Sequence, residues 1–144
     1  MGSRRHAREI ALQMLYLCDN CRISPEDARD CVVSKSGEIL SPAVKSFSLQ
    51  LFDGIADKKE ELDNIIEHSA ENWEMNRMAC VDRNILRLAA YEITDMKDTP
   101  INVIINEAVE IAKRFSTDDS GKFVNGILDN MKTARNNAPL SSKC

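Results

Sequence analysis

The N-terminal end of the chain carries a run of side chains that could bind phosphate. Arg4, Arg5, His6 and Arg8 are close together in a sequence whose formal net charge is −4. Arginine binds phosphate through forked, charge-assisted hydrogen bonds. An acidic chain does not suit a general nucleic-acid coat, because nonspecific binding rests on widespread Lys and Arg. Any contact with nucleic acid must therefore be local.

A second candidate site lies near the C-terminus, on a predicted helix. On a helical wheel Lys122 and Gly126 fall opposite the apolar stripe, with Asp119 nearby and Phe123 at its margin. Glycine inside a helix costs roughly 1 kcal/mol relative to alanine, so an outward-facing glycine suggests a close approach by a helix or ligand. Phe123 could stack on an unpaired base while Lys122 binds a phosphate. Packing of Phe123 against another helix would explain the spacing equally well.

The elements that must position these residues are helices throughout. In the first one, apolar residues recur at helical spacing on the face that should point to the core. These are Ala7, Ile10, Ala11, Met14, Leu15 and Cys18. Leu12 and Tyr16 fall on the opposite, solvent side beside Arg5, where an aromatic next to guanidinium groups suits a phosphate-bearing or protein partner. The alternative is a solvated first turn with a partly covered tyrosine.

Cap residues and prolines divide the rest of the chain into further helices. We expect helices to begin at Pro25, Pro42 and Pro100, and a last one to be capped by residues 116–119. Gly54 should mark a bend or boundary. Trp73 and Phe115 fall on apolar faces and should be buried.

The long helix expected over residues 78–96 holds two carboxylates, Asp82 and Glu92, within or beside its apolar stripe. Each must find hydrogen bonds or a cation, or face a partner. Periodic alternation typical of strands is missing, so the sequence predicts an all-α fold. We expect residues 1–135 to form one domain and residues 136–144 a frayed tail.

Several classes of function find little support in the sequence. The five cysteines form an irregular, odd set that suits reduced thiols, and the pair Cys18 and Cys21 closes a helix rather than opening one. Phosphate-binding glycine loops and hydrolase or metalloprotease motifs are missing, so we expect no enzyme, no metal and no cofactor. The sequence shows no span of membrane length, and the expected location is the cytoplasm.

Four sequence blocks resemble the NusB transcription antitermination family. The blocks are Arg4-Arg5-His6-Ala7-Arg8-Glu9 with Ala11-Leu12-Gln13-Met14-Leu15-Tyr16, then residues 82–92 (DRNILRLAAYE), residues 100–115 (PINVIINEAVEIAKRF) and residues 122–129 (KFVNGILD). Only residues 20–75 match weakly. The resemblance implies a compact fold of two packed three-helix-type bundles, with about six to seven helices.

The resemblance also implies a function and a set of partners. A NusB-like chain binds single-stranded boxA RNA of nascent rRNA transcripts together with the ribosomal protein NusE, as part of an RNA polymerase antitermination complex. The matching positions assign RNA binding to Arg4, Arg5, Arg8, Lys122 and Phe123, and partner binding to Tyr16 and Asp82. We add His6 to the RNA-binding set and Leu12 to the partner-binding set from their places beside these residues, and Asp119 and Gly126 border the partner surface. His6 stands where many members have a third arginine, which predicts a weaker or pH-sensitive phosphate contact.

Three questions stay open at the level of sequence. Some members of the family self-associate, and a homodimer is compatible with this chain. A similar helical module precedes the catalytic domain of rRNA methyltransferases, although this chain lacks the glycine-rich fold of such an enzyme. A purely protein-binding helical adaptor, with a solvated basic end, is the third alternative.

Overall fold

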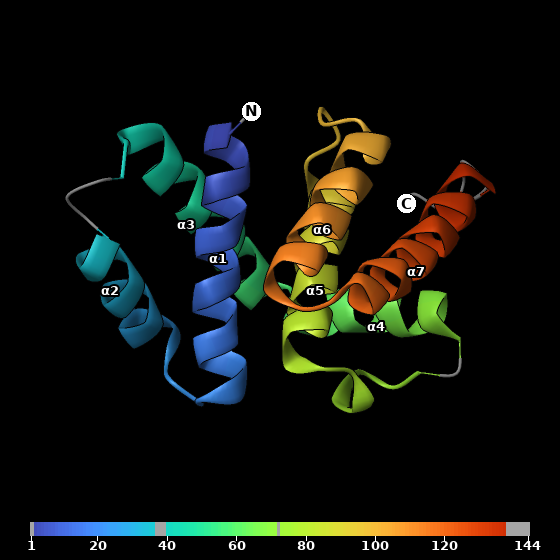
Figure 1. Cartoon of the computed structure of the whole chain (residues 1–144), viewed down its shortest axis with the longest axis horizontal. Coiled ribbons are helices and arrows are strands. Elements are labelled where there is room, and N and C mark those ends of the chain that lie inside the picture. Colours follow the sequence, from blue (N-terminus) through green and yellow to red (C-terminus); the bar gives the residue numbers. More distant parts are fainter. Residues whose placement is uncertain (1, 37–39, 72, 138–144) are drawn as a thin grey trace.

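The computed structural model describes residues 2–36, 40–71 and 73–137, and Figure 1 shows their arrangement. The helices are α1 (Gly2–Asn20), α2 (Pro25–Ser36), α3 (Pro42–Asp57), α4 (Lys59–Ala70), α5 (Cys80–Asp95), α6 (Ile101–Phe115) and α7 (Asp118–Asn137), with a short 3-10 turn η1 (Met75–Arg77). The described residues contain no strand, so the all-α prediction is confirmed. None of these helices is long and apolar enough to cross a membrane.

Helix starts follow the expected capping chemistry at three places. The hydroxyl of Ser24 accepts the backbone N–H of Asp27 at 3.1 Å, and that of Ser41 accepts the N–H of Val44 at 3.2 Å. Each serine directly precedes a helix that begins with proline, whose missing N–H costs nothing in the first turn. At α7 the hydroxyl of Thr117 accepts the N–H of Ser120 at 3.0 Å.

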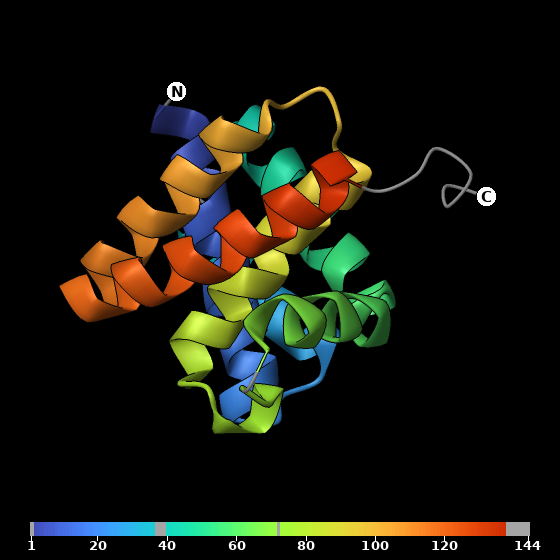
Figure 2. The same cartoon turned by 90° about the vertical axis from the view of Figure 1, so that its right-hand side faces the viewer.

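Helix α5 is the centre of the molecule. It packs against α1 and α3 on one side and against α4, α6 and α7 on the other, as Figures 1 and 2 show. Residues 84–90 are buried without interruption, as expected of a helix covered all round. The two predicted bundles therefore share one helix and one core.

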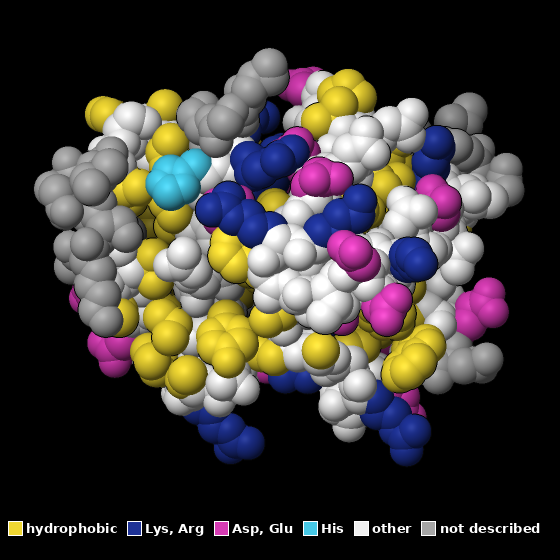
Figure 3. Space-filling view, viewed as in Figure 1, with side chains coloured by type: hydrophobic (Ala, Val, Ile, Leu, Met, Phe, Trp, Pro, Cys, Tyr) yellow, Lys and Arg dark blue, Asp and Glu magenta, His cyan; other side chains and the backbone are white. Residues whose placement is uncertain are grey.

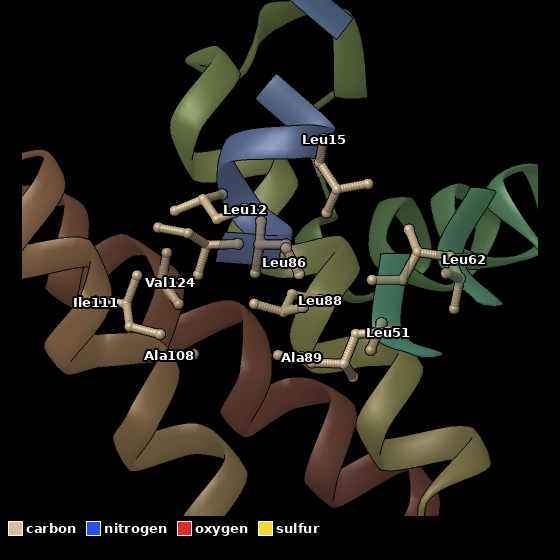
Figure 4. Packing of buried hydrophobic residues seen from close by; sticks show 14 of the residues in the cluster. Leu12, Leu15, Leu51, Leu62, Leu86, Leu88, Ala89, Ala108, Ile111 and Val124 are labelled. Atoms are coloured by element: carbon tan, nitrogen blue, oxygen red, sulfur yellow. The ribbon is translucent and has the colours of Figure 1, made fainter. Parts of the chain in front are cut away.

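That core is a single cluster to which every long helix contributes. Figure 4 shows the centre of this cluster, where Leu12 and Leu15 of α1 meet side chains from α3, α4, α5, α6 and α7. The labelled partners are Leu51, Leu62, Leu86, Leu88, Ala89, Ala108, Ile111 and Val124.

Several expectations about individual residues were wrong. Leu12, expected on the solvent side, is only 5% exposed, because α1 is covered on more than one face. Trp73 and Phe115, expected in the core, are 49% and 42% exposed because each lies at or beyond the end of its helix. Gly54 does not break a helix but lies inside α3.

Three boundaries also differ from expectation. Helix α6 begins at Ile101 and not at Pro100, because Pro100 is its N-cap residue and no side chain caps this end. Met78 precedes α5 instead of lying within it, although its side chain is buried. Helix α7 continues to Asn137, just past the predicted start of the tail, and residues 138–144 lie outside the described residues.

Candidate nucleic-acid and partner interface

Arg5 on α1 faces Glu107 on α6 through a two-point ion pair. Its Nε donates to Oε1 at 2.9 Å and its Nη2 to Oε2 at 2.7 Å. The arginine side chain keeps 40% of its surface exposed. Hydrogen bonding by Arg5, together with the charges of Arg5 and Arg8, holds the pKa of Glu107 below its ordinary value despite burial. The pair is thus fully charged at neutral pH and accessible from outside.

Arg8 lies one helical turn further along α1, but it is buried. Its Nε and Nη2 donate to the two carboxylate oxygens of Glu92 at 2.7 and 2.8 Å, and its Nη1 donates to Glu107 at 3.4 Å. Only 4% of the residue is exposed. The expectation of a free guanidinium at this position was wrong. Arg8 neutralises the Glu92 carboxylate that α5 brings into the core, and a cation is one of the three solutions expected for this carboxylate.

The two remaining basic positions of the N-terminal run are exposed. The guanidinium of Arg4 lies over the ring of Phe47 from α3, 4.6 Å from its centroid, in a cation–π contact. No carboxylate among the described residues forms an ion pair with Arg4. His6 is exposed and lines a groove beside Arg5. Arg4 and His6 can therefore meet a phosphate without giving up an internal carboxylate.

The seam between α1 and α6 carries charges of both signs. A third pair joins Arg114 on α6 to Glu9 on α1 at 3.0 Å. Figure 3 shows dark blue and magenta side chains interspersed over the upper parts of these helices. Most of the positive charge at this end of the molecule is thus paired with carboxylates of the same chain.

A mainly apolar pocket adjoins the other end of this seam. Its volume is about 410 Å³, and hydrophobic side chains gather beside it over the lower parts of α1 and α2 (Figure 3). The lining residues are Glu9, Leu12, Gln13, Tyr16, Leu17, Cys31, Val32, Val81 and Phe115. Leu12 and Tyr16, both predicted to bind a partner, share this wall. An apolar pocket with a polar rim suits an anchoring side chain of a protein partner.

Asp82, the next predicted partner residue, lies beneath the surface at the start of α5. Its Oδ2 accepts a hydrogen bond from the hydroxyl of Ser120 at 3.1 Å, whereas Oδ1 is buried without a hydrogen bond. Burial raises the pKa of Asp82, and the bond from Ser120 opposes this only in part. The charged form of Asp82 is therefore disfavoured inside the protein.

The residues predicted on α7 form a separate surface. Phe123 is half-buried against Trp73, with ring centroids 5.6 Å apart in an edge-to-face arrangement. Lys122, Asp119 and Gly126 are exposed, and a Cβ added at Gly126 would meet nothing within 4 Å. The ring of Phe123 therefore packs on a neighbouring ring, and its stacking on an RNA base stays a prediction.

The structure does not join the α7 surface to the N-terminal basic run. Helix α6 lies between α1 and α7 in Figure 1, and no ion pair or ring contact among the described residues links Arg4 or Arg5 to Lys122 or Phe123. A single ligand that touches both surfaces must therefore be long enough to cross α6.

Comparison with known proteins decides the family. Residues 5–133 match the sequence model of the NusB family. The chain belongs to the NusB family. A relative from Desulforapulum autotrophicum, named transcription antitermination protein NusB, is 42% identical over 136 residues, which cover 94% of this chain and 95% of the relative. A second one from Geobacter sulfurreducens, with the same name, is 45% identical over 90% of this chain and 93% of the relative.

Solved NusB structures have the same fold. T. maritima NusB superposes with a TM-score of 0.82 at 37% identity and covers 97% of this chain and 96% of its own. A crystal structure of the antitermination factors NusB and NusE in complex with dsRNA gives a TM-score of 0.84 at 29% identity, covering 93% and 98%. These findings confirm the predicted family, the all-α NusB fold and the assignment to antitermination factors, a regulatory class rather than an enzyme class.

Sequence reasoning about this NusB chain missed the carboxylates that meet its arginines. Glu107 lies 102 residues from Arg5, and Glu9 lies 105 residues from Arg114. Of these carboxylates, only Glu92 could be recognised from the sequence as needing a partner, because it lies in an apolar stripe. Phe47 and Trp73 were also missed as ring partners of Arg4 and Phe123, because nothing in local spacing indicates a cross-helix ring contact.

The described residues contain no candidate metal site and no activated thiol. Cys18, Cys21, Cys31 and Cys80 are free thiols, and no group of His, Cys, Asp and Glu among the described residues could hold a metal ion. Burial raises the pKa of both Cys18 and Cys80, with a further contribution from Asp19. Both thiols are therefore poor nucleophiles at neutral pH.

Proposed function

We propose that this chain binds single-stranded boxA RNA together with a NusE-type ribosomal protein, and acts in the cytoplasm within an RNA polymerase antitermination complex. Support comes from the family and from the neighbouring structure of NusB with NusE and dsRNA. The observation that carries the proposal lies on α1. One end of this helix presents Arg4, Arg5 and His6, and its other half presents Leu12 and Tyr16 to an apolar pocket.

In this proposal the RNA backbone is bound by three exposed cations, Arg4, Arg5 and Lys122. Phe123 and Trp73 offer ring surface to an unpaired base. Arg8 is a positioning residue, because its guanidinium is committed to Glu92 and Glu107. Since Lys122 and the N-terminal run lie on different helices, the RNA crosses α6.

The protein partner occupies the mainly apolar pocket that Leu12, Tyr16 and Val32 line. Leu12 and Tyr16 form its wall, and Asp82 follows the lining residue Val81 at the start of α5. Asp119 and Gly126 border the partner or the RNA from α7. Placing the two binding surfaces at opposite ends of one helix lets RNA and protein bind simultaneously.

The test is a titration of fluorescent boxA RNA, with and without NusE, at several salt concentrations. Three phosphate contacts predict a log–log salt slope near −2, since each contact to a single strand contributes roughly 0.7. Arg4→Gln should weaken binding and flatten the slope. Arg22→Gln is the matched control, because Arg22 is an exposed arginine beyond the far end of α1.

The adaptor alternative is favoured by one observation, the internal neutralisation of Arg5, Arg8 and Arg114 by carboxylates. Binding of NusE without any RNA binding at low salt would support that alternative and refute ours. A second copy of the chain could also fill the pocket, and sedimentation with and without NusE distinguishes the two occupants. The two relatives described above do not support the methyltransferase alternative, because both are named transcription antitermination protein NusB.

A further inference from the structure

Glu107 is placed between two arginines that have very different surroundings. Arg5 offers it two hydrogen bonds from a side chain that is 40% exposed, and Arg8 offers a longer one, 3.4 Å, from a side chain that is 4% exposed. Glu107 itself keeps 19% of its side-chain surface. Its carboxylate therefore has one partner that can leave and one that cannot.

The contact between Arg5 and Glu107 has the form of an arginine–phosphate contact. A carboxylate and a phosphate both present two oxygens to the forked N–H groups of a guanidinium, and both prefer a bidentate arrangement. Nε and Nη2 of Arg5 are taken by Glu107, so a phosphate that approaches this edge of the guanidinium competes for the same two donors. Arg4, one residue away, has no such competitor among the described residues.

We propose that Glu107 occupies the place of an RNA phosphate on Arg5 and is exchanged for that phosphate when RNA binds. This inference rests on the proposed function and adds to it a residue that sets the RNA affinity of Arg5. After the exchange Arg8 still faces the Glu107 carboxylate, so the freed anion is not left without a cation. Glu107 thus lowers the affinity for a phosphate bound at this edge of Arg5.

The ion pair between Arg8 and Glu92 explains why Arg8 stays next to Glu107 when Arg5 leaves it. Glu92 holds Nε and Nη2 of Arg8 inside the core and leaves Nη1 directed to Glu107. The position of Arg8 is therefore set by α5 and does not depend on RNA. Arg5 has no second carboxylate to hold it in place. Among the described residues, Glu107 is the only carboxylate that forms an ion pair with it.

The test is a double-mutant cycle on Arg5 and Glu107, read as boxA RNA affinity at several salt concentrations. Glu107→Gln should tighten binding about two- to fivefold, the range expected for an exposed ion pair. The salt slope should change little, because Arg5 contacts the phosphate in both proteins once RNA is bound. In an Arg5→Gln background the same substitution should leave the affinity unchanged.

Glu110→Gln is the matched control for overall charge. Glu110 lies one turn along α6, is half exposed, pairs with Lys113 at 3.7 Å, and acts on Arg5 through its charge without a hydrogen bond. A gain from Glu110→Gln equal to that from Glu107→Gln, or a gain that persists without Arg5, would show a general charge effect and overturn the proposal. Weaker binding by Glu107→Gln would overturn it too, because Glu107 would then position Arg5 for RNA.

Folding and the parent proposal are checked separately. Far-ultraviolet circular dichroism and thermal unfolding report whether Glu107→Gln keeps the fold. If Glu107→Gln does not fold, Glu107→Asp is the second variant. It keeps the negative charge but shortens the side chain, so RNA affinity should still increase, by less than in Glu107→Gln. If the unmodified protein binds no RNA with or without NusE, the proposed function fails; if it binds and only the cycle shows no coupling, this inference alone fails.

Discussion

Arg8 and Glu92, 84 residues apart in the sequence, form a two-point ion pair inside the protein, with N–O distances of 2.7 and 2.8 Å. They are 4% and 1% exposed. The pair joins α1 to the central helix α5, and through Glu107 it extends to α6. A basic residue that sequence reasoning assigned to RNA thus ties three helices together.

Removing Arg8 should damage the fold more than it damages any single RNA contact. Arg8→Ala leaves Glu92 as a buried charge without its cation, which costs about 3–5 kcal/mol of unfolding free energy. The double substitution Arg8→Met with Glu92→Leu should recover most of that loss, because no charge then stays buried. Urea denaturation measures both. An Arg8→Ala protein with unchanged stability and reduced RNA affinity would contradict this role.

The sequence predicted the helices well and the partners of their charges poorly. Proline and serine caps at Ser24 and Ser41 are local, so their hydrogen bonds could be predicted from neighbouring residues. The carboxylates of Glu92 and Glu107 meet α1 only after the chain has folded. A helical wheel places Arg5 on the outer side correctly, but it does not show which other helix lies there. Leu12 was misplaced for the same reason, since α1 is covered on more than one face.

Two glycines inside helices should respond oppositely to alanine. At Gly54 of α3 a Cβ would lie 2.2 Å from the Tyr91 hydroxyl oxygen, so the ring of Tyr91 must shift. Gly54→Ala should lower the unfolding free energy by about 1–3 kcal/mol, as expected of overpacking. Gly126→Ala has open space and should raise it by up to about 1 kcal/mol. Thermal unfolding of both variants measures the difference, and equal shifts would refute the contact at Gly54.

Asp19 should support the fold mainly above pH 4. Burial alone would raise the pKa of Asp19, but hydrogen bonds from Arg83 and Asn84 and the charges of Arg87 and Arg83 hold it well below its usual 3.8. Because the folded-state pKa is lowered, the stabilisation is present above the ordinary value and is lost as pH falls below it. Asp19→Asn should therefore lower stability at pH 7 and flatten the acid side of a stability–pH profile from urea unfolding. Asp57→Asn, at an exposed position of α3, is the control and should leave the profile unchanged.

Asp82 should behave in the opposite sense. Burial raises its pKa, so the charged form is disfavoured in the folded protein, and at neutral pH this carboxylate costs stability. Asp82→Asn should keep or raise the unfolding free energy at pH 7, and the difference should vanish as pH falls below 3.8, where both side chains are neutral. If Asp82 contributes to NusE binding, the same variant binds NusE more weakly despite its unimpaired fold. Loss of stability at pH 7 would contradict the raised pKa of Asp82.

Trp73 is the only tryptophan of the chain and lies against Phe123, so its fluorescence reports on the α7 surface. A base that stacks there would cover an indole that is 49% exposed in the free protein. Titration with boxA RNA should change the emission with the same midpoint as the anisotropy of labelled RNA. Lys122→Gln should weaken both signals in parallel, while Arg22→Gln should leave them unaltered. RNA that binds tightly without changing the Trp73 emission would place the whole RNA site on α1 and α6, and would remove Lys122 and Phe123 from it.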